Sequence, residues 1–447
     1  MNRQLRVAIV GAGPAGIYAS DILARAADDV AIDVIDQLPT PYGLVRYGVA
    51  PDHPRIKEII KALRNILANP RIRFVGNVDY GSDVKLDDLR RWYDAVIFAT
   101  GARFDRGLDI PGIDLPGSYG AADFVSWFDA HPDVPTTWPL GAEQVAIFGA
   151  GNVALDVARM LAKTADELLA TEIPDQVYQG LKANRAADIH IFARRGPAQI
   201  KFTPLELREL SHSPNVEVVV HSEGFEFDEG SMAAIRASKA TKLVVDTLQN
   251  YAAREPEGKI HRIHLHFLQS PAAVLGSEAV TGVRTERTEL VGDGTVRGTG
   301  TYTDWPAQAV YRAVGYLSSA LVGVPFDDAA GVVPNEAGRV LDIDGAPMPG
   351  LYVTGWIKRG PVGLIGHTKS DAAETIRCLM EDRDALAPAE EVNGDGLLAH
   401  LGANGVEFTT TSGWEKLDAH EIALGEPQGR ARVKVPTREE MIRISND

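Results

Sequence analysis

The stretch Leu5–Ala26, LRVAIVGAGPAGIYASDILARA, decides the fold of the amino-terminal part of this 447-residue chain. A short apolar strand leads into GAGPAG, and the residues after it repeat apolar side chains at helical spacing. Gly11 permits the tight turn, Gly13 lets a pyrophosphate approach the backbone, and Gly16 lets the helix pack closely on the strand. The next apolar strand, VAIDVIDQ, ends near Asp36, an acid expected to accept a hydrogen bond from a ribose hydroxyl. The pattern predicts a dinucleotide site, with a purely structural glycine turn as the alternative.

A second turn of the same kind lies in the stretch VAIFGAGNVALDVAR. It carries Gly149 and Gly151, and Ala154 takes the place of the third glycine, which this pattern tolerates. The following strand, IHIFARRGP, ends on Arg194 and Arg195 instead of on an acid. Guanidinium groups are planar, permanently charged donors that match a phosphate monoester. The pair predicts recognition of the 2′-phosphate of NADP, with solvated surface arginines as the alternative.

Two such turns on one chain indicate either two dinucleotide sites or a duplicated fold. Because Asp36 disfavours a 2′-phosphate and the arginines favour one, FAD is expected in the first site and NADP(H) in the second. We predict an α/β fold of two Rossmann-like three-layer dinucleotide-binding domains, with the NADP domain inserted into the FAD domain. The predicted boundaries are 1–104 for the first part of the FAD domain, 105–320 for the NADP domain, and 321–447 for the second part of the FAD domain with a carboxy-terminal extension.

The composition excludes several classes of protein. A net charge of −16 argues against nucleic acid as the main partner. The lone Cys378 excludes a disulfide framework, a CxxC redox pair and a cysteine-ligated metal centre, and no metal site is expected. MNRQL leads directly into the first strand, and the sequence contains no long uncharged apolar span. A cytoplasmic protein without a membrane partner is therefore expected.

A flavin and a nicotinamide cofactor on one chain imply hydride transfer between them. The electrons must then leave, and the single cysteine argues against reductases of the thioredoxin and glutathione reductase kind. The phenylalanine–glycine–histidine–tryptophan signature of Baeyer–Villiger monooxygenases is also absent from the sequence. A one-electron protein carrier, a quinone-like acceptor and oxygen remain as acceptors.

Several long motifs occur in an order that resembles the adrenodoxin reductase family, which includes bacterial ferredoxin–NADP⁺ reductases. They are PTPYGLVRYGVAPDHPRIK, GNVALDVARML, ARRGP, FTPLELREL, GWIKRGPVGLIG and SGWEKLDAHEIALGEPQGRARVK, and together they span almost the whole chain. The resemblance implies the reaction NADPH + 2 oxidised ferredoxin ⇌ NADP⁺ + 2 reduced ferredoxin + H⁺. The alternative is an NADPH diaphorase that reduces quinones or other small acceptors. An electron-transfer subunit like the small subunit of glutamate synthase is disfavoured, because such subunits carry cysteine clusters.

The resemblance also implies roles for matching positions. The implied FAD contacts, beside the glycines of the first turn, are Ala15, Asp36, Leu44, Val78, Trp356, Gly363, Leu364 and Ile365. The implied NADP contacts are Gly151, Asn152, Val153, Arg194, Arg195, Glu206 and Gly363. The family commonly has Glu where this chain has Asp36. Trp356 is expected to cover a ring face, with an ordinary core position as the alternative, and Lys358 and Arg359 are expected to be solvated.

His53 and Glu209 resemble a pair that lies near the nicotinamide in this family. There the pair is thought to position the carboxamide or to relay protons, a role that suits imidazole and carboxylate groups. From the residues alone, His53 is a loop histidine and Glu209 belongs to one face of an ordinary helix.

An acidic ferredoxin requires a basic docking face on this acidic chain, and residues 232–267 contain more basic than acidic side chains. Such a face would steer a negatively charged carrier and make docking sensitive to salt. The residues expected on it are Lys201, Arg208, Arg236, Lys239 and Lys242. A scattered solvated surface is the alternative, and a monomer is expected.

Overall fold

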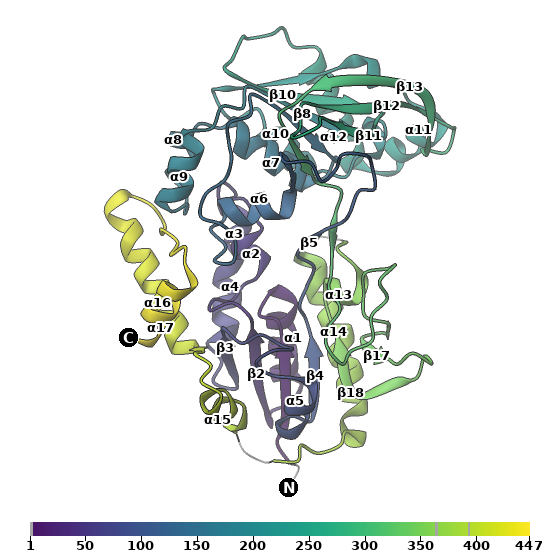
Figure 1. The fold of residues 1–447 in the computed structure, drawn as a ribbon. Helices are drawn as coiled ribbons and strands as arrows, with labels where there is room; N and C mark the ends of the chain where they lie inside the picture. The colour runs from purple at the N-terminus through teal and green to yellow at the C-terminus, as the bar shows by residue number, and fades with distance from the viewer. Residues whose placement is uncertain (1–2, 363–364, 392–393) are drawn as a thin grey trace. The chain divides into compact units, whose positions relative to one another are not determined.

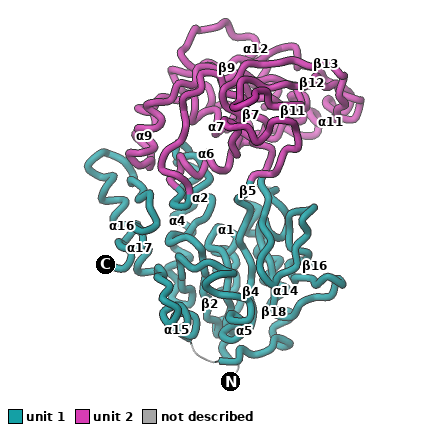
Figure 2. The backbone as a smooth tube through the Cα atoms, viewed as in Figure 1, with its two compact units in different colours: residues 1–104, 131–133, 316–447 teal, residues 105–130, 134–315 magenta. Residues whose placement is uncertain are grey.

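The computed structural model divides into two compact units, shown in Figure 2. The residues that the structure describes are 3–362, 365–391 and 394–447. Unit 1 comprises residues 1–104, 131–133 and 316–447, and unit 2 comprises residues 105–130 and 134–315. Unit 2 is therefore inserted in sequence between the two main parts of unit 1. The chain leaves unit 1 for unit 2 at the short strand β5 (Phe104–Asp105) and returns to unit 1 at the short strand β15 (Tyr316–Leu317).

Unit 1 is built on an eight-stranded sheet in the order β16-β17-β18-β4-β1-β2-β3-β19 (Figure 1). The strands from β18 to β3 run parallel, and β16, β17 and β19 add antiparallel pairs at the edges. The strands are β1 (Leu5–Val10), β2 (Val30–Asp36), β3 (Ile72–Gly76), β4 (Ala95–Phe98), β16 (Asn335–Glu336), β17 (Arg339–Leu341), β18 (Pro347–Val353) and β19 (Thr409–Thr410).

Helices cover both faces of this sheet. The helices of unit 1 are α1 (Pro14–Ala26), α2 (Leu44–Tyr47), α3 (Pro54–Lys57), α4 (Ile59–Leu67), α5 (Leu86–Trp92), α13 (Trp356–Arg359), α14 (Ile365–Asp382), α15 (Gly396–Ala403), α16 (Thr411–Gly425) and α17 (Arg438–Asn446). Because side chains alternate along a strand, Val7 and Ile9 of β1 join one apolar core with α1 and α14, and Ala8 and Val10 join another with α5 and α15. The unit therefore has three layers.

Unit 2 contains a six-stranded sheet in the order β6-β14-β7-β8-β10-β9, in which every neighbouring pair is parallel. Its strands are β6 (Ser118–Gly120), β7 (Gln144–Phe148), β8 (Asp188–Ala193), β9 (Val216–Val220), β10 (His261–Phe267) and β14 (Ala309–Arg312). Its helices are α6 (Ala121–Phe128), α7 (Asn152–Ala162), α8 (Ala165–Leu168), α9 (Asp175–Lys182), α10 (Pro204–Glu209), α11 (Glu229–Ala237) and α12 (Lys239–Ala252).

An antiparallel three-stranded sheet completes unit 2. It consists of β11 (Gln269–Leu275), β12 (Gly282–Leu290) and β13 (Val296–Pro306). Val274 and Val283 of this sheet share an apolar core with Phe148 and Phe192 of the parallel sheet. The antiparallel sheet therefore covers one face where a Rossmann unit would carry helices. The predicted α/β class with two Rossmann-like units is confirmed.

A helix that crosses a lipid bilayer must be both long and apolar. Within the described part of the chain, none combines the length and the apolar character needed to cross a membrane.

Candidate functional site

The first glycine turn joins β1 to α1. Gly11 has a φ of +115°, and a Cβ atom there would lie 2.4 Å from the carbonyl oxygen of Ala99. A Cβ on Gly16 would lie 2.0 Å from the carbonyl oxygen of Gly11, so only glycine permits this packing of helix on turn. A Cβ on Gly13, in contrast, would meet nothing within 4 Å. The turn is thus tight at two glycines and open at the third, as close approach of a pyrophosphate requires.

A second loop lies beside this turn. The backbone N–H of Tyr42 donates to the carbonyl oxygen of Ala12 at 2.8 Å, and a Cβ on Gly43 would lie 3.1 Å from Cα of Gly13. Tyr42 and Gly43 both have positive φ, and Leu44 then begins α2. Among the residues that the structure describes, no side chain caps the amino terminus of α1, whose free N–H groups and dipole favour an anion. The loop therefore frames an anion site at this helix end.

Asp36 is bonded to the backbone of the turn. Its Oδ2 accepts the N–H of Ala12 at 2.7 Å, and its Oδ1 accepts the N–H of Leu38 at 2.9 Å. Burial raises the pKa of Asp36 to about 6, although these two hydrogen bonds oppose the shift. Val78 lies beside it and donates its N–H to the carbonyl oxygen of Asp36 at 2.9 Å. Each carboxylate oxygen keeps a lone pair for a further donor such as a ribose hydroxyl.

The turn after β18 reaches the same helix end. Gly355 has a φ of +78°, and a Cβ there would lie 2.7 Å from the Cβ of Ala15 in the first turn of α1. Trp356, which follows, is half-buried and begins α13. The structure thus brings Ala15 and the Trp356 turn together. The other residues predicted on this turn are Gly363 and Leu364, which lie outside the described residues, and Ile365, which begins α14.

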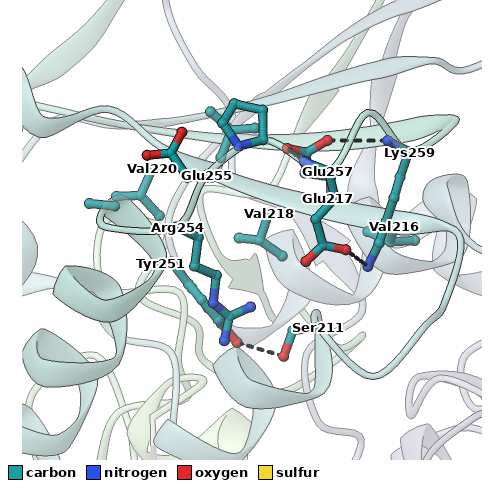
Figure 3. Close-up of a pocket in the computed structure, with 13 residues that line it drawn as sticks. Ser211, Val216, Glu217, Val218, Val220, Tyr251, Arg254, Glu255, Glu257 and Lys259 are labelled. Atoms are coloured by element: carbon teal, nitrogen blue, oxygen red, sulfur yellow. Dashed lines mark hydrogen bonds and ion pairs between the residues drawn. The ribbon is translucent and has the colours of Figure 1, made fainter.

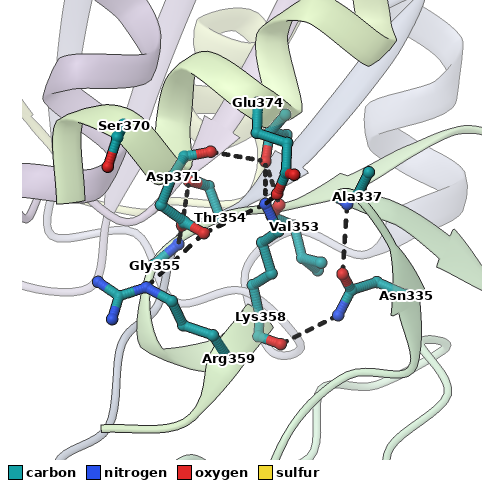
Figure 4. Close-up of polar contacts among 12 residues, drawn as sticks. Asn335, Ala337, Val353, Thr354, Gly355, Lys358, Arg359, Ser370, Asp371 and Glu374 are labelled. Atoms are coloured by element: carbon teal, nitrogen blue, oxygen red, sulfur yellow. Dashed lines mark hydrogen bonds and ion pairs between the residues drawn. The ribbon is translucent and has the colours of Figure 1, made fainter. Parts of the chain in front are cut away.

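Lys358 corrects the expectation of a solvated side chain. It is 8% exposed, and its Nζ lies 3.1 Å from Oδ1 of Asp371 and 2.7 Å from Oε2 of Glu374 (Figure 4). The expectation was wrong because both carboxylates come from α14. Their approach to α13 depends on tertiary packing that the local sequence does not reveal.

The second glycine turn, between β7 and α7, repeats the geometry of the first. Gly149 has a φ of +130°, and a Cβ there would lie 2.1 Å from the carbonyl oxygen of Ala313. A Cβ on Gly151 would meet nothing within 4 Å, and no side chain caps α7. Ala154 is fully buried, so its methyl group fits where the third glycine usually stands. This turn is likewise open where an anion would bind.

Arg194 and Arg195 follow directly on β8. Their carbonyl oxygens are held by the hydroxyl of Thr288 at 2.6 Å and by the N–H of Leu268 at 3.3 Å. Arg194 is exposed and Arg195 is half-buried. Neither guanidinium forms an ion pair or a hydrogen bond with the residues that the structure describes. Their donors are therefore available to an anionic ligand.

Asn152 and Val153 form the first residues of α7, and a following loop returns to them. The Oδ1 atom of Asn152 accepts the N–H of Thr203 at 2.9 Å. Thr203 caps α10, whose first turn carries the buried Glu206. Oε2 of Glu206 lies 3.7 Å from Nη1 of Arg159 in α7. Two predicted NADP residues, Asn152 and Val153, thus begin α7, and a third, Glu206, lies near Arg159 of the same helix.

The two residues predicted to be catalytic belong to different units. His53 directly precedes α3 in unit 1, and Glu209 ends α10 in unit 2. Their pairing stays a prediction.

The chain is similar over its whole length to known proteins. A family model described as pyridine nucleotide-disulphide oxidoreductase matches residues 5–196. The chain is 43% identical to NADPH-ferredoxin reductase FprA of Mycobacterium tuberculosis, over 99% of both chains. It is 37% identical to the mitochondrial NADPH:adrenodoxin oxidoreductase of Arabidopsis thaliana, over 99% of this chain and 95% of that protein. The chain belongs to the adrenodoxin reductase family. The solved structure of Mycobacterium tuberculosis FprA in complex with NADPH matches this family member with a TM-score of 0.93, at 41% identity and full coverage of both chains.

The basic side chains expected to dock a partner are all exposed on unit 2 of this adrenodoxin reductase family member. They are Lys201, Arg208, Arg236, Lys239 and Lys242. Lys242 forms an ion pair with Asp246 at 2.6 Å, which reduces its contribution to a positive surface. A docking role for these residues stays a prediction.

A pocket of about 150 Å³ lies along the edge strand β9 of the parallel sheet in unit 2 (Figure 3). Val216, Val218 and Val220 form one wall, and Tyr251 of α12 contributes to another. Glu217 accepts the backbone N–H groups of residues 257–259, which closes the loop over the pocket. None of the predicted cofactor residues lines this pocket.

Four stacked imidazoles in unit 2 were missed from the sequence. The Nδ1 of His190 lies 3.0 Å from Nε2 of His266, and the Nε2 of His221 lies 3.3 Å from Nδ1 of His264. His190 stacks on His264 with ring centroids 4.4 Å apart, and His221 stacks on His266 at 4.3 Å. His264 also contacts Asp188 at 2.9 Å. The pattern HLH in a strand puts both histidines on one face and could have indicated this histidine array.

Proposed function

We propose that this chain is an NADPH–ferredoxin oxidoreductase in which unit 1 holds FAD and unit 2 holds NADP(H). The observation that carries the proposal is the pair Arg194 and Arg195, whose guanidinium groups are free beside a glycine turn open at Gly151. Such a pair suits the 2′-phosphate that distinguishes NADP from NAD. Membership of the adrenodoxin reductase family supports the same assignment.

The reaction is NADPH + 2 oxidised ferredoxin ⇌ NADP⁺ + 2 reduced ferredoxin + H⁺. When bound, FAD takes up two electrons as a hydride and releases them one at a time. The residues present fit both dinucleotides. Space for a pyrophosphate is open beside Gly13 and beside Gly151, and a Cβ atom at either position would occupy that space.

In unit 1 the backbone and a few side chains bind the flavin dinucleotide. The amino terminus of α1 and the backbone at Gly13 take the pyrophosphate, and Asp36 accepts the ribose hydroxyl. Leu44, Val78 and the Trp356 turn enclose the rest of the molecule. A ribose hydroxyl that donates to Asp36 favours the ionised carboxylate and therefore lowers its raised pKa on binding.

In unit 2 the amino terminus of α7, with Asn152 and Val153, binds the pyrophosphate of NADP(H), and Glu206 completes the site. Arg194 and Arg195 bind the 2′-phosphate through charge-assisted hydrogen bonds. His53 and Glu209 are proposed to hold the carboxamide of the nicotinamide or to relay a proton.

The proposed partner is an acidic ferredoxin. The exposed basic side chains of unit 2 are proposed to steer it, so that its reduction slows as salt rises. A monomeric, cytoplasmic enzyme is proposed from the sequence.

Stopped-flow absorbance tests this proposal. NADPH and NADH are each mixed with the flavin-loaded protein, as the parent chain and as Arg194→Ala/Arg195→Ala, and an acidic ferredoxin is added afterwards. We expect rapid bleaching by NADPH, ferredoxin-dependent reoxidation, and a preference for NADPH that falls at least about tenfold in the variant, since even one lost charged hydrogen bond costs about 1.5–3 kcal/mol. Arg297→Ala, which removes an exposed arginine of β13, is the control.

Three results would contradict the proposal at different points. A purified chain that binds no flavin would refute the assignment of unit 1. An unchanged NADPH preference in the double variant would refute the role of the arginines. Reoxidation by quinones or oxygen but not by ferredoxin would indicate an NADPH diaphorase.

A further inference from the structure

The turn that carries Trp356 is held by a carboxylate of α14 that is outside the predicted site. Oδ2 of Asp371 accepts the backbone N–H of Gly355 at 2.5 Å and the hydroxyl of Thr354 at 3.0 Å (Figure 4). Thr354 also donates its own N–H to the carbonyl oxygen of Phe98, the last residue of β4, at 2.9 Å. A single carboxylate oxygen therefore fixes the backbone where β18 ends and α13 begins.

The other oxygen of Asp371 is directed at cations. Oδ1 lies 3.1 Å from Nζ of Lys358 and 3.6 Å from Nε of Arg359. The side chains of Asp371 and Lys358 are 9% and 6% exposed, so the carboxylate and the ammonium group compensate each other away from water. Both oxygens of Asp371 are engaged by protein groups. Any effect of Asp371 on a neighbouring ligand is therefore exerted through the backbone at Thr354 and Gly355 that it holds.

Lys358 ties the rest of α13 to the same network. Its Nζ contacts Glu374 at 2.7 Å and Thr375 at 3.3 Å, both on α14. Its carbonyl oxygen accepts a hydrogen bond from the side-chain amide of Asn335 at 3.0 Å. Figure 4 shows these residues converging on the short helix from α14 and from β16. Glu374 thus shares Lys358 with Asp371 but contacts neither Gly355 nor Thr354.

The backbone that Asp371 holds lies against the amino terminus of α1. Gly355 has positive φ, and a Cβ there would lie 2.7 Å from the Cβ of Ala15. Trp356 follows directly. We propose that Asp371 is a positioning residue of the FAD site, which fixes the Trp356 turn against the first turn of α1. This role rests on the proposed binding of FAD to unit 1.

The test uses Asp371→Ala, Asp371→Asn and Thr354→Val, with Glu374→Gln as the matched control. The apoprotein of each variant is titrated with FAD, and the fluorescence quenching gives the dissociation constant. Visible circular dichroism of the bound flavin reports its environment, and thermal unfolding of the apoprotein reports stability separately.

We expect Asp371→Ala to weaken FAD binding about tenfold or more and to change the flavin dichroism, since a charge-assisted hydrogen bond to the turn is lost. Asp371→Asn keeps an oxygen that accepts from Gly355, so it gives an intermediate affinity. Glu374→Gln stays within about twofold of the parent, because a half-exposed ion pair contributes little.

Each contrary outcome has its own meaning. A parent chain that binds no FAD refutes the proposed function. If the parent binds FAD and Asp371→Ala matches it in affinity and dichroism, the positioning role is refuted. The positioning role is also refuted if Asp371→Ala and Glu374→Gln lose FAD affinity equally and the loss in each variant parallels its loss of apoprotein stability. If Asp371→Ala does not fold, Thr354→Val and Asp371→Asn decide, and an unchanged flavin dichroism in both overturns the proposal.

Discussion

Gly13 and Gly16 belong to one turn but meet opposite surroundings. A Cβ on Gly13 has open space, and its φ of −74° suits alanine, whereas a Cβ on Gly16 would lie 2.0 Å from a carbonyl oxygen. We expect Gly13→Ala to stabilise the apoprotein by about 0.4–1 kcal/mol, because alanine has fewer unfolded conformations. The same methyl group should weaken FAD binding at least about tenfold by filling the space for the pyrophosphate.

Gly16→Ala is the matched comparison, and we expect it to lower the free energy of unfolding by about 1–3 kcal/mol or more through overpacking. Urea unfolding of the apoproteins and FAD titration measure the two effects. Gly13 is assigned to ligand approach and Gly16 to helix packing. A loss of apoprotein stability in Gly13→Ala, or an unchanged FAD affinity in that variant, would contradict this assignment.

Individual residues of the site could be predicted where they belong to a local motif. Asp36 ends β2, and Arg194 and Arg195 directly follow β8, so strand position alone indicated them. Lys358 and Asp371 could not be predicted, because they meet only when α14 packs beside α13. From sequence alone, a charged side chain is predicted to be exposed to solvent unless its partner is known.

We expect the histidine array on β8, β10 and the segment after β9 to make the stability of unit 2 sensitive to acid. Burial, and to a smaller extent the neighbouring imidazoles, together lower the pKa of His190 to about 4 and that of His266 to about 2. An unfolded histidine has a pKa of about 6.5. Below about pH 6.5 the unfolded chain therefore binds protons at His190, His221 and His266 that the folded chain does not, and stability falls as the pH drops toward 4. Asp188, Arg262 and Glu223 are the charged groups that face the array.

In His266→Phe the unfolded chain takes up about one proton fewer than in the parent. We therefore expect the free energy of unfolding to fall less steeply with decreasing pH, by about 1.4 kcal/mol per pH unit between pH 6.5 and 4. Denaturant unfolding at a series of pH values measures the slope. His212→Phe, at an exposed histidine of unit 2, is the control and should leave the slope unchanged. Identical slopes for the parent and His266→Phe would show that the array is not the source of the acid sensitivity.

The carboxy-terminal segment is bonded to the loop beside the first glycine turn. Nη2 of Arg46 in α2 lies 2.5 Å from Oε1 of Glu421 in α16, and both side chains are buried. Lys434 donates to the carbonyl oxygen of Arg46 at 2.7 Å. The segment therefore supports the loop that contains Tyr42.

We expect Glu421→Gln to lower the free energy of unfolding by about 3–5 kcal/mol, because it leaves the buried Arg46 without its close charged partner. FAD should also dissociate faster from the loosened loop. Glu415→Gln, at an exposed position of the same helix, is the control, and denaturant unfolding with flavin fluorescence measures both effects. A stability equal to that of the Glu415→Gln variant would contradict the role of the pair.

Elements were predictable to different degrees. The two strand–turn–helix openings follow from contiguous residues with a clear period, and both are present as β1–α1 and β7–α7. The antiparallel sheet β11–β13 and the edge strand β19 were missed. β19 pairs with β3, far away in sequence, so its two residues carry no local signal. The long exposed strand β13 lacks the apolar alternation that marks a half-buried strand.

On the scale of the whole molecule, two units with separate cores should respond separately to their ligands. A ligand present at a hundred times its dissociation constant adds about 2.7 kcal/mol to the unit that binds it. In calorimetry of the apoprotein we expect FAD to raise the transition of unit 1 and NADP⁺ that of unit 2. Arg194→Ala/Arg195→Ala should reduce only the NADP⁺ effect. An NADP⁺ effect that is undiminished in the variant would contradict the role assigned to unit 2.

The inserted arrangement also sets the order in which the chain can fold during translation. β4 ends at Phe98, but its parallel neighbour β18 begins only at Pro347, after all of unit 2. At about 5–20 residues per second, the ribosome takes roughly 12–50 s to deliver the missing strand. During that time one edge of β4 lacks its hydrogen-bonding partner, and such an edge can template aggregation. The nascent enzyme thus completes its inserted unit while its host sheet is still open, and this interval is when a chaperone would matter most.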